Sequence, residues 1–580
     1  MSPNAGSTAL EAPEKPERAE MCQDKARVAL VLMGVGLVIA LMAILALSIV
    51  VVYREKPHPS GSERDGVDIV NYLENSLRES GFDEVKKVPY LLVHPLTDPE
   101  HPNSVRLTDE DGTVLLEAKM TEDKIPGIDT DIGPAYLAFS ARGTVEAELI
   151  FVNYGRYEDF DELEKEGVSV AGFICLMRYN KGFRGDKVRV CEERGGVGAI
   201  LFGDPMDLAP KGEDFVFPNS EYVGGSAMQR GTLDVLQDSE TPGYPSIPEA
   251  MRIMDPPGLP KIPAQVIGYD DARVLLELLG GTEWHVEGGF NFTYRTGPFA
   301  PSHKGKKVRL SVNNIKKRLV VHDVIGVIRG SVEPGQFSVT GNHHDAWGFG
   351  ASDPSSGTAA LLEASRTLGA MVARGWRPRR SIVVAFWAQE EVGMAGSREW
   401  VEEHINLLTR SAVGYVNIDT CADGSLFVPQ ASPSLRNLFY KANEVMFVSK
   451  PNTPFHFTNC FSHIDLPGSG SDNAVFNVFA GIPSVEVYFG PDPELDGVPT
   501  GPYYHTAYET LELYESFIDP DYSIMERCSQ LVGALTLSLA EAELLPYNMV
   551  DLGQALRDGF GDLQTHMEDF EAHNVSAGAN

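Results

Sequence analysis

Several short apolar runs of this sequence end in side chains that bind metals or transfer protons. The candidates at the ends of these runs, or on loops beside them, are His343, Asp353, Glu390, Glu391, Asp419 and His505. A single acid at the end of a strand is usually a helix cap or a solvated loop residue. Several acids at one edge of one sheet would repel one another unless a cation compensates their charge. We therefore expect a metal site.

The residue types at this edge suit zinc and a hydrolytic reaction. Imidazole and carboxylate are ordinary zinc ligands, and a water shared by two metals is an activated nucleophile at neutral pH. The carboxylates together with one hydroxide would nearly balance the charge of two Zn²⁺ ions. The adjacent Glu390 and Glu391 can divide the work, because one can bind metal while the other accepts the proton of the water.

The elements that must position these residues alternate regularly from about residue 318 onward. Apolar runs typical of strands are 323–330, 336–343, 381–389, 412–419 and 482–489, and stretches typical of helices are 356–375 and 394–408. This alternation predicts an α/β sheet with helices on both faces, in which functional residues collect on loops past the strand ends. From about 105 to 317 the pattern is mixed, which indicates a separate domain in a chain of 580 residues.

Composition and charge narrow the class of protein. The chain is 43% hydrophobic and 22% charged, as in globular proteins, and its net charge of −34 argues against nucleic-acid binding. The uncharged run 28–52 is longer than the ~20 residues that span a bilayer and than the apolar region of a signal peptide. With slightly more basic residues before it than after it, it predicts a single-pass type II protein of the plasma membrane, with the catalytic part outside the cell.

The cysteines and the N-glycosylation sequons give little further information about the class of protein. The six cysteines show no CxxC spacing, so neither a zinc ribbon nor a disulfide scaffold is expected. Asn291 and Asn574 lie in N-x-S/T sequons and are candidate glycosylation sites.

The residues around the candidate ligands resemble a known family. The segments "GNHHDAWGFGASDPSSG", "AFWAQEEVGMAGSREW", "GYVNIDT" and "YYHTAYET" are similar to the glutamate carboxypeptidase II / transferrin receptor family of co-catalytic zinc peptidases, and "GFRGDKV", "TPGYPSIP" and "GSGSD" extend the likeness. The resemblance implies a zinc-peptidase mixed sheet flanked by helices, with an inserted protease-associated apical domain. The implied organisation is a cytoplasmic tail (1–27), a transmembrane anchor (28–53), a stalk and first part of the peptidase domain (54–105), the apical domain (106–317), the zinc peptidase domain (318–543) and a remnant of a C-terminal helical dimerisation domain (544–580).

The resemblance also implies a role for each site residue. His343 and Asp419 would hold one zinc, Glu391 and His505 the other, and Asp353 would bridge both. Glu390 would be the general base, and Tyr504 would hydrogen-bond the oxyanion, a role that suits its phenol. Glu399 and Glu402 match two carboxylates of a structural calcium site; the alternative is a pair of exposed acids on a helix face.

The substrate pocket follows the family only in part. Arg184 matches the arginine that binds the terminal carboxylate of the substrate, for which the alternative is a surface salt bridge. Residues Ser469, Gly470 and Ser471 fall on a substrate-binding segment, although Ser471 replaces an asparagine. Ile247, Phe427 and Glu486 replace polar or basic residues of the family, and a negative Glu486 should repel an acidic residue before the scissile bond.

These expectations lead to one main hypothesis with alternatives. We expect a membrane-anchored di-zinc exopeptidase that hydrolyses short extracellular peptides, most readily by releasing a C-terminal residue. The family forms homodimers, which the short segment 544–580 would weaken. The alternatives are an aminopeptidase or dipeptidase of the same fold, or an inactive transferrin receptor-like binding protein. A retired site should have lost ligands, and here all five and the base are present.

Overall fold

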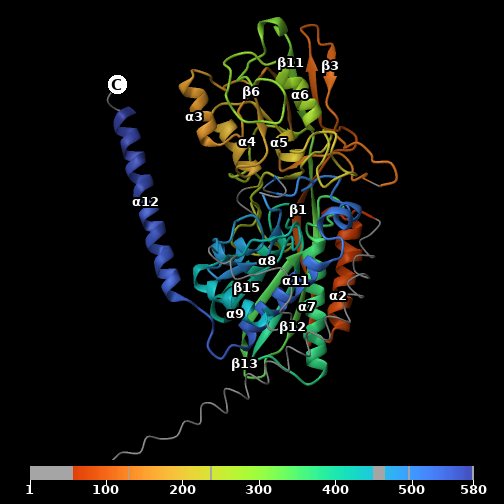
Figure 1. Ribbon diagram of the computed structural model, residues 1–580, viewed down its shortest axis with the longest axis vertical. Coiled ribbons are helices and arrows are strands. Elements are labelled where there is room, and N and C mark those ends of the chain that lie inside the picture. The colour runs from red at the N-terminus through yellow and green to blue at the C-terminus, as the bar shows by residue number, and fades with distance from the viewer. Residues whose placement is uncertain are drawn as a thin grey trace, which may run out of the picture.

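The computed structural model describes residues 56–128, 130–234, 238–447, 464–493, 497–498 and 500–577. Its main sheet has seven strands in the order β1-β12-β14-β13-β15-β18-β17 (Figure 1). The strands are β1 (Glu84–Leu96), β12 (Ile315–Ile328), β13 (Glu333–His343), β14 (Arg380–Trp387), β15 (Ala412–Asn417), β17 (Gln430–Ala431) and β18 (Ser484–Glu486). Strands β14, β13, β15 and β18 are mutually parallel and the remaining pairs are antiparallel. The predicted mixed α/β fold is therefore confirmed.

Helices cover both faces of this sheet. One face packs against α2 (Val70–Glu79), α7 (Ser355–Ala373), α9 (Arg436–Phe447) and α11 (Ser523–Glu541), and the other against α8 (Ala395–Ser411). Because both faces are covered, the central strands are largely buried, and every residue of β14 is buried. The covered sheet is a rigid support for the loops at its edges.

A long excursion of the chain interrupts the main sheet. Strands β1 and β12 pair antiparallel along their length, with Leu96 opposite Ile315, so the chain leaves the sheet at one residue and returns at its neighbour. The residues between, 104–312, form the inserted region, with its own hydrophobic core. Figure 1 shows it stacked on one end of the main sheet. Its identification as a protease-associated domain remains a prediction.

Two four-stranded sheets and one two-stranded parallel sheet, of β4 (Leu137–Ala138) and β9 (Gly231–Thr232), make up the inserted region. The four-stranded parallel sheet has the order β10-β8-β7-β6, and the antiparallel one β3-β2-β11-β5. The strands are β2 (Ser104–Thr108), β3 (Val114–Glu117), β5 (Gly143–Ala147), β6 (Leu149–Phe151), β7 (Ile174–Arg178), β8 (Gly198–Phe202), β10 (Ala264–Val266) and β11 (Lys307–Val312). The helices are α3 (Tyr157–Lys165), α4 (Arg184–Glu193), α5 (Pro205–Leu208) and α6 (Tyr269–Glu277).

The prediction of a membrane-anchored, extracellular type II protein is corrected. Throughout the described part of the chain, no helix combines the length and the apolar character needed to cross a bilayer. The segment on which that prediction depended, residues 28–53, lies outside the described residues.

The sequence left the disulfide state open, and the described residues contain two disulfides. Cys175 bonds to Cys191 inside the inserted region, and Cys421 bonds to Cys528, 107 residues further along the chain. The second bond links a loop past β15 to helix α11. Spacing alone did not predict these bonds because both pairs are brought together by packing of the core, where all four residues are buried.

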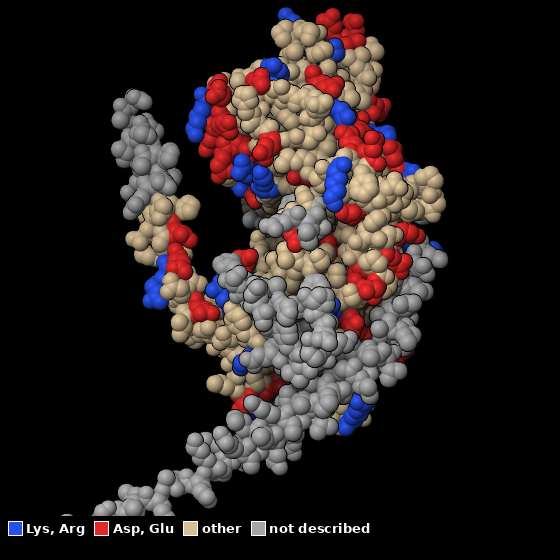
Figure 2. Space-filling model, in the orientation of Figure 1, with Lys and Arg blue, Asp and Glu red and all other residues tan. Residues whose placement is uncertain are grey.

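Helix α12 (Met549–Ala577) extends away from the body of the molecule (Figures 1 and 2). Apolar side chains of this helix lie exposed, among them Val550, Leu556, Phe560, Leu563 and Met567. Figure 2 also shows acidic side chains spread over the inserted region, in keeping with the excess of acidic over basic residues in the sequence. The dimerisation role expected for residues 544–580 stays a prediction.

Candidate active site

The parallel strands bring the candidate ligands to one edge of the main sheet. His343 is the last residue of β13, Glu390 and Glu391 follow β14, and Asp419 follows β15. Since β14, β13 and β15 are adjacent and parallel, their carboxyl ends meet. Asp353 lies on the loop before α7, and this loop returns it to the same edge.

The five predicted metal ligands lie within contact distance. His343 Nε2 is 3.2 Å from Asp353 Oδ1 and 3.3 Å from Asp419 Oδ1. His505 Nε2 is 3.2 Å from Asp353 Oδ2 and 3.1 Å from Glu391 Oε2. Two sets of three donors result, His343–Asp353–Asp419 and Asp353–Glu391–His505, each able to hold a metal ion. Asp353 belongs to both.

The electrostatics of the cluster fit a cation. Burial raises the pKa of Glu391 well above its ordinary value, and the charge of Asp353 raises it further. Glu391 Oε1 and Asp353 Oδ1 are buried and accept no hydrogen bond from a described residue. Imidazole nitrogen and carboxylate oxygen are the donors that zinc prefers. The residues present therefore fit zinc.

Polar residues that sequence reasoning missed hold the ligand loops in place. Asp345 accepts the backbone N–H of Glu390 at 3.0 Å through Oδ1, while its carbonyl oxygen lies 3.0 Å from His343 Nδ1. Glu509 Oε1 accepts the backbone N–H groups of Ser352 at 3.2 Å and Asp353 at 2.6 Å. The indication in the sequence was present, because each residue lies within a few positions of a predicted ligand.

Asp423 joins three loops of the site. Its carboxylate accepts hydrogen bonds from Ser352 Oγ at 3.1 Å, Tyr488 Oη at 3.0 Å and Tyr503 Oη at 2.5 Å. Ser352 precedes Asp353 and Tyr503 precedes Tyr504, so one carboxylate fixes segments that are far apart in the chain. Like Glu509, Asp423 lies a few positions after a predicted ligand, here Asp419, so the same indication was present in the sequence.

Close packing and unusual backbone conformations also shape the site. A Cβ at Gly357, in the first turn of α7, would lie 1.9 Å from the carbonyl oxygen of Asp419, so only glycine lets this helix approach the ligand loop. Asp419 and His505 have positive φ angles of 54° and 60°. Such conformations are costly for residues with a side chain and persist where the surrounding structure enforces them.

Glu390 is placed differently from the ligands. It belongs to neither donor set, and its carboxylate accepts no hydrogen bond from a described residue. Burial raises its pKa well above the ordinary value, although nearby His343 opposes this. A carboxyl group in this state beside a metal site is suited to accepting and returning a proton.

Tyr504 and Arg184 form the wall of the site next to the Glu391–His505 donors. The ring of Tyr504 stacks on that of His505, with 3.6 Å between centroids. Arg184 lies at the start of α4, where it interacts with Tyr504 and is attracted electrostatically by the negative charge of Glu391. A Cβ at Gly231 would lie 2.3 Å from Arg184 Cζ, so a glycine backbone packs directly on the guanidinium.

The guanidinium of Arg184 has a hydrogen-bond donor that no described residue uses. Its Nη2 donates to Gln229 Oε1 at 3.3 Å, while its Nε is buried without a hydrogen-bond partner among the described residues. Arg184 is partly buried, and among the described residues no carboxylate forms an ion pair with it.

The remaining predicted residues are placed as follows. Ser471 is buried and its Oγ accepts Asn417 Nδ2 at 2.9 Å, whereas Ser469 and Gly470 are exposed. Asn291 is exposed in the inserted region, and Asn574 lies in α12. Their roles in substrate binding and glycosylation stay predictions.

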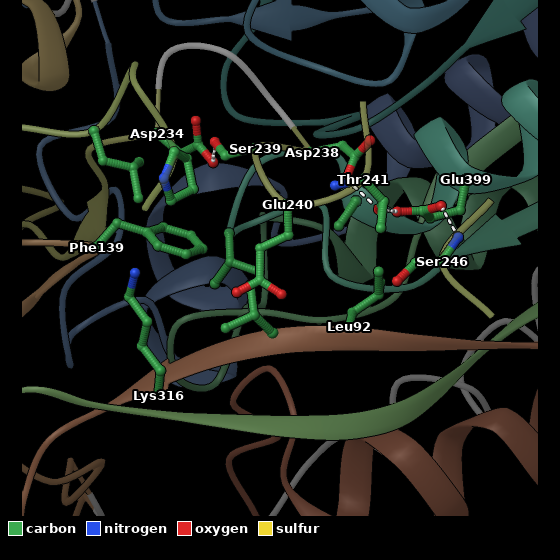
Figure 3. Close-up of a pocket in the computed structure, with 15 residues that line it drawn as sticks. Leu92, Phe139, Asp234, Asp238, Ser239, Glu240, Thr241, Ser246, Lys316 and Glu399 are labelled. Atoms are coloured by element: carbon green, nitrogen blue, oxygen red, sulfur yellow. Dashed lines mark hydrogen bonds between the residues drawn. The ribbon is translucent and has the colours of Figure 1, made fainter. Parts of the chain in front are cut away.

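A second acidic cluster lies between α8 and the inserted region (Figure 3). Glu399 and Glu402 are 0% and 5% exposed, so the alternative of exposed helix-face acids is wrong. Thr241 Oγ1 donates to Asp238 at 2.7 Å and lies 3.2 Å from Glu399 Oε1, and Glu402 accepts the backbone N–H of Gly243 at 2.9 Å. A cavity of about 30 Å³ adjoins the cluster, with Glu399 and Asp238 among its lining residues.

The carboxylates of this second cluster are incompletely compensated. Burial raises the pKa of Glu399 to about 9 and that of Asp238 to about 7; the charge of Asp238 adds to the first shift and that of Glu402 to both. Asp238 Oδ2 and Glu402 Oε2 are buried and accept no hydrogen bond from a described residue. Arg398 Nε donates to Glu402 at 2.6 Å and is the one cation paired with the cluster in the described structure.

Comparisons with known proteins agree with this geometry. Residues 323–520 match peptidase family M28. The chain is 33% identical over 560 residues to aminopeptidase NAALADL1 of Rattus norvegicus, covering 90% of this chain and 74% of that protein. It is 32% identical over 538 residues to a glutamate carboxypeptidase 2 homolog of Caenorhabditis briggsae, covering 87% and 69%. Among solved structures, a peptidase M28 precursor of Shewanella amazonensis SB2B has a TM-score of 0.53 at 16% identity, covering 89% of this chain and 98% of that one, which shows the fold alone.

Proposed function

The chain belongs to peptidase family M28 and is a zinc metallopeptidase; from this premise we propose that it holds two zinc ions and removes single residues from short peptides. The observation that carries the proposal is Asp353, which lies within 3.2 Å of both His343 and His505 and so completes both donor sets. A binding protein that had lost its chemistry would not need this arrangement, and here every donor and Glu390 are retained.

The chain's own residues supply the rest of the chemistry. Bound zinc polarises a carbonyl oxygen and makes a water more acidic. Glu390 accepts the proton of the water that attacks the scissile carbonyl and then delivers it to the nitrogen of the leaving amine. Tyr504 donates a hydrogen bond to the oxyanion that develops on the former carbonyl oxygen. The tetrahedral centre collapses when the C–N bond breaks, leaving a carboxylate and a free amine.

Release of the C-terminal residue is the favoured direction. Arg184 lies beside Tyr504, its buried Nε has no hydrogen-bond partner among the described residues, and a guanidinium can bind a carboxylate through two parallel hydrogen bonds. The second candidate is aminopeptidase action, supported by the name of the NAALADL1 relative.

We also propose a structural calcium ion at the second acidic cluster. The oxygens of Asp238 and Glu402 that accept no hydrogen bond within the described structure, with the carboxylate of Glu399, are hard oxygen donors of the kind that calcium takes. The ion would link α8 to the inserted region, because Asp238 and Thr241 come from the latter.

The test is metal content and turnover of the full chain beside a Glu390→Gln variant. We expect two zinc ions per chain in both proteins and a kcat for short peptides that is about 10²–10⁴-fold lower in the variant. Glu512→Gln, an exposed acid outside the site, is the matched control. Fewer than two zinc ions in the wild type, or equal turnover in the variant, would contradict the proposal.

A further inference from the structure

Glu486 extends the row of strand-end residues by one strand beyond the metal ligands. It is the last residue of β18, and its register partner on the adjacent parallel strand β15 is Asn417, two positions before Asp419. The four neighbouring parallel strands therefore each have one such residue at their carboxyl end. Glu391 follows β14 and Asp419 follows β15, while His343 is the last residue of β13 and Glu486 the last of β18. Glu486 belongs to neither donor set, so its carboxylate is not needed to hold metal.

The surroundings of Glu486 orient its carboxylate without neutralising it. Asn473 Nδ2 donates to Glu486 Oε2 at 3.0 Å and is itself held by the carbonyl oxygen of Gly468 at 3.3 Å. No lysine, arginine or histidine of the described chain forms an ion pair with it. Burial raises its pKa to about 8, and the neighbouring charges of Asp419 and Asp472 act in the same direction. A cationic group would remove this electrostatic cost.

The two ends of the site therefore present different groups: a guanidinium at one end, and at the other a carboxyl group that a cationic partner would hold ionised. Arg184 interacts with Tyr504 and Glu391, at the end formed by the Glu391–His505 donors. Glu486 interacts with Asp419, at the end formed by the His343–Asp419 donors. A peptide whose scissile carbonyl lies over the metal site extends toward both ends.

We infer that Glu486 accepts the terminal ammonium group of the residue before the scissile bond, so that the preferred substrates are unblocked dipeptides. This inference rests on the proposed function. In a dipeptide the ammonium and the carboxylate flank the scissile bond at the two adjacent Cα atoms, and these charges match Glu486 and Arg184. An ammonium donates charge-assisted hydrogen bonds to a carboxylate, whereas an acidic side chain at this position is repelled.

The experiment compares four substrates on the zinc-loaded full chain: Ala-Leu, N-acetyl-Ala-Leu, N-acetyl-Lys-Leu and Ala-Leu amide. We expect N-acetylation of Ala-Leu to lower kcat/KM about 10-fold or more, chiefly through KM, because a buried carboxylate loses its partner. Glu486→Gln should lower kcat/KM for Ala-Leu and abolish the effect of acetylation, and Glu486→Asp should retain part of it. Glu512→Gln should behave as the wild type.

Other outcomes overturn the inference or separate it from the proposed function. Equal rates on Ala-Leu and N-acetyl-Ala-Leu, or an unchanged ratio in Glu486→Gln, would overturn it. Efficient hydrolysis of N-acetyl-Lys-Leu would place the recognised ammonium on the side chain and overturn the assignment to the terminus. Calorimetric binding of the same peptides to the Glu390→Gln protein needs no turnover. A preference for free Ala-Leu there, without hydrolysis by the wild type, would support Glu486 and reject the proposed function.

Discussion

This molecule contains two groups of buried carboxylates. In both, burial disfavours the charged form, and the two groups differ in the partners that compensate for it. In the active site, imidazoles lie between the acids, so that His343 and His505 each contact two carboxylates. In the second cluster, Glu399, Glu402 and Asp238 are held by backbone N–H groups, Thr241 and one arginine. Burial raises the pKa of carboxyl groups in both.

The difference lies in the donors that each group can offer to a metal. Nitrogen and oxygen donors in sets of three suit zinc, whereas oxygen donors alone suit calcium. The first group also contains one acid, Glu390, that belongs to neither donor set and can therefore accept and return a proton. The second group has no equivalent acid among the described residues. This contrast supports the catalytic role that we propose for the first group and the structural role that we propose for the second.

The largest effect should come from the shared ligand. Asp353→Ala removes a donor from both sets at once, so we expect loss of at least one zinc per chain and a fall in kcat of about 10³-fold or more. Metal analysis and peptide turnover measure both quantities. The exposed acid Asp214, changed to Asn, is the control. Two tightly held zinc ions in Asp353→Ala would show that this residue does not bridge the sets.

A smaller effect is expected at the positive end of the active site. Arg184→Met should raise KM for peptides with a free carboxylate about 10–100-fold, with a smaller change in kcat, because a charge-assisted hydrogen bond is lost. Arg184→Lys should recover only part of the affinity, because an ammonium cannot form the two parallel bonds of a guanidinium. Steady-state kinetics on Ala-Leu and its amide provide the measurement. An equal loss on the amide would argue against recognition of the carboxylate.

Calcium should act on stability and not on turnover. Chelation by EGTA is expected to lower the Tm of the full chain by about 2–5 °C, since a bound ion stabilises the folded state by mass action. Glu399→Gln should make Tm insensitive to EGTA, whereas Glu403→Gln, an exposed acid of the same helix, should leave the response intact. Persistence of the full EGTA response in Glu399→Gln would remove this cluster as the calcium site.

The smallest effect is a pH dependence confined to the calcium-free protein. The pKa of Glu399 rises from its ordinary 4.5 to about 9 in the folded state, so the folded protein binds more protons than the unfolded chain between these values. The free energy of unfolding should therefore fall as pH rises through this window. Calcium favours the ionised carboxylate and should flatten the dependence. Thermal unfolding at several pH values, with and without calcium, tests the sign, and a rise of Tm with pH without calcium would contradict it.

The sequence was sufficient to predict the metal-binding edge because strand ends and their polar residues are local features. His343 and Asp419 could be placed from apolar runs that β13 and β15 reproduce. The supporting residues could not be placed in this way. Glu509 reaches Asp353 across more than 150 residues of chain, and Cys421 meets Cys528 only when α11 packs on the sheet.

The sequence also did not predict which of the charged side chains would be buried. Glu399 and Glu402 have the spacing of an exposed helix face, yet segment 238–246 of the inserted region covers them. The sequence likewise allowed Arg184 to be a surface residue, whereas in the structure it packs against Gly231. Both depend on how the inserted region docks on the main sheet, and no short-range pattern encodes that docking.

The pairing of Leu96 with Ile315 gives the molecule a modular character. The two points where the chain enters and leaves the inserted region are neighbours on adjacent strands, so a short turn could in principle join them directly. Such an excision would keep the strands that carry His343, Glu391 and Asp419 while deleting Arg184 and Asp238. The proposed zinc ligands and Arg184 are thus encoded in separate stretches of chain, which meet in contacts such as the one between His505 Nδ1 and the carbonyl oxygen of Arg230 at 3.2 Å.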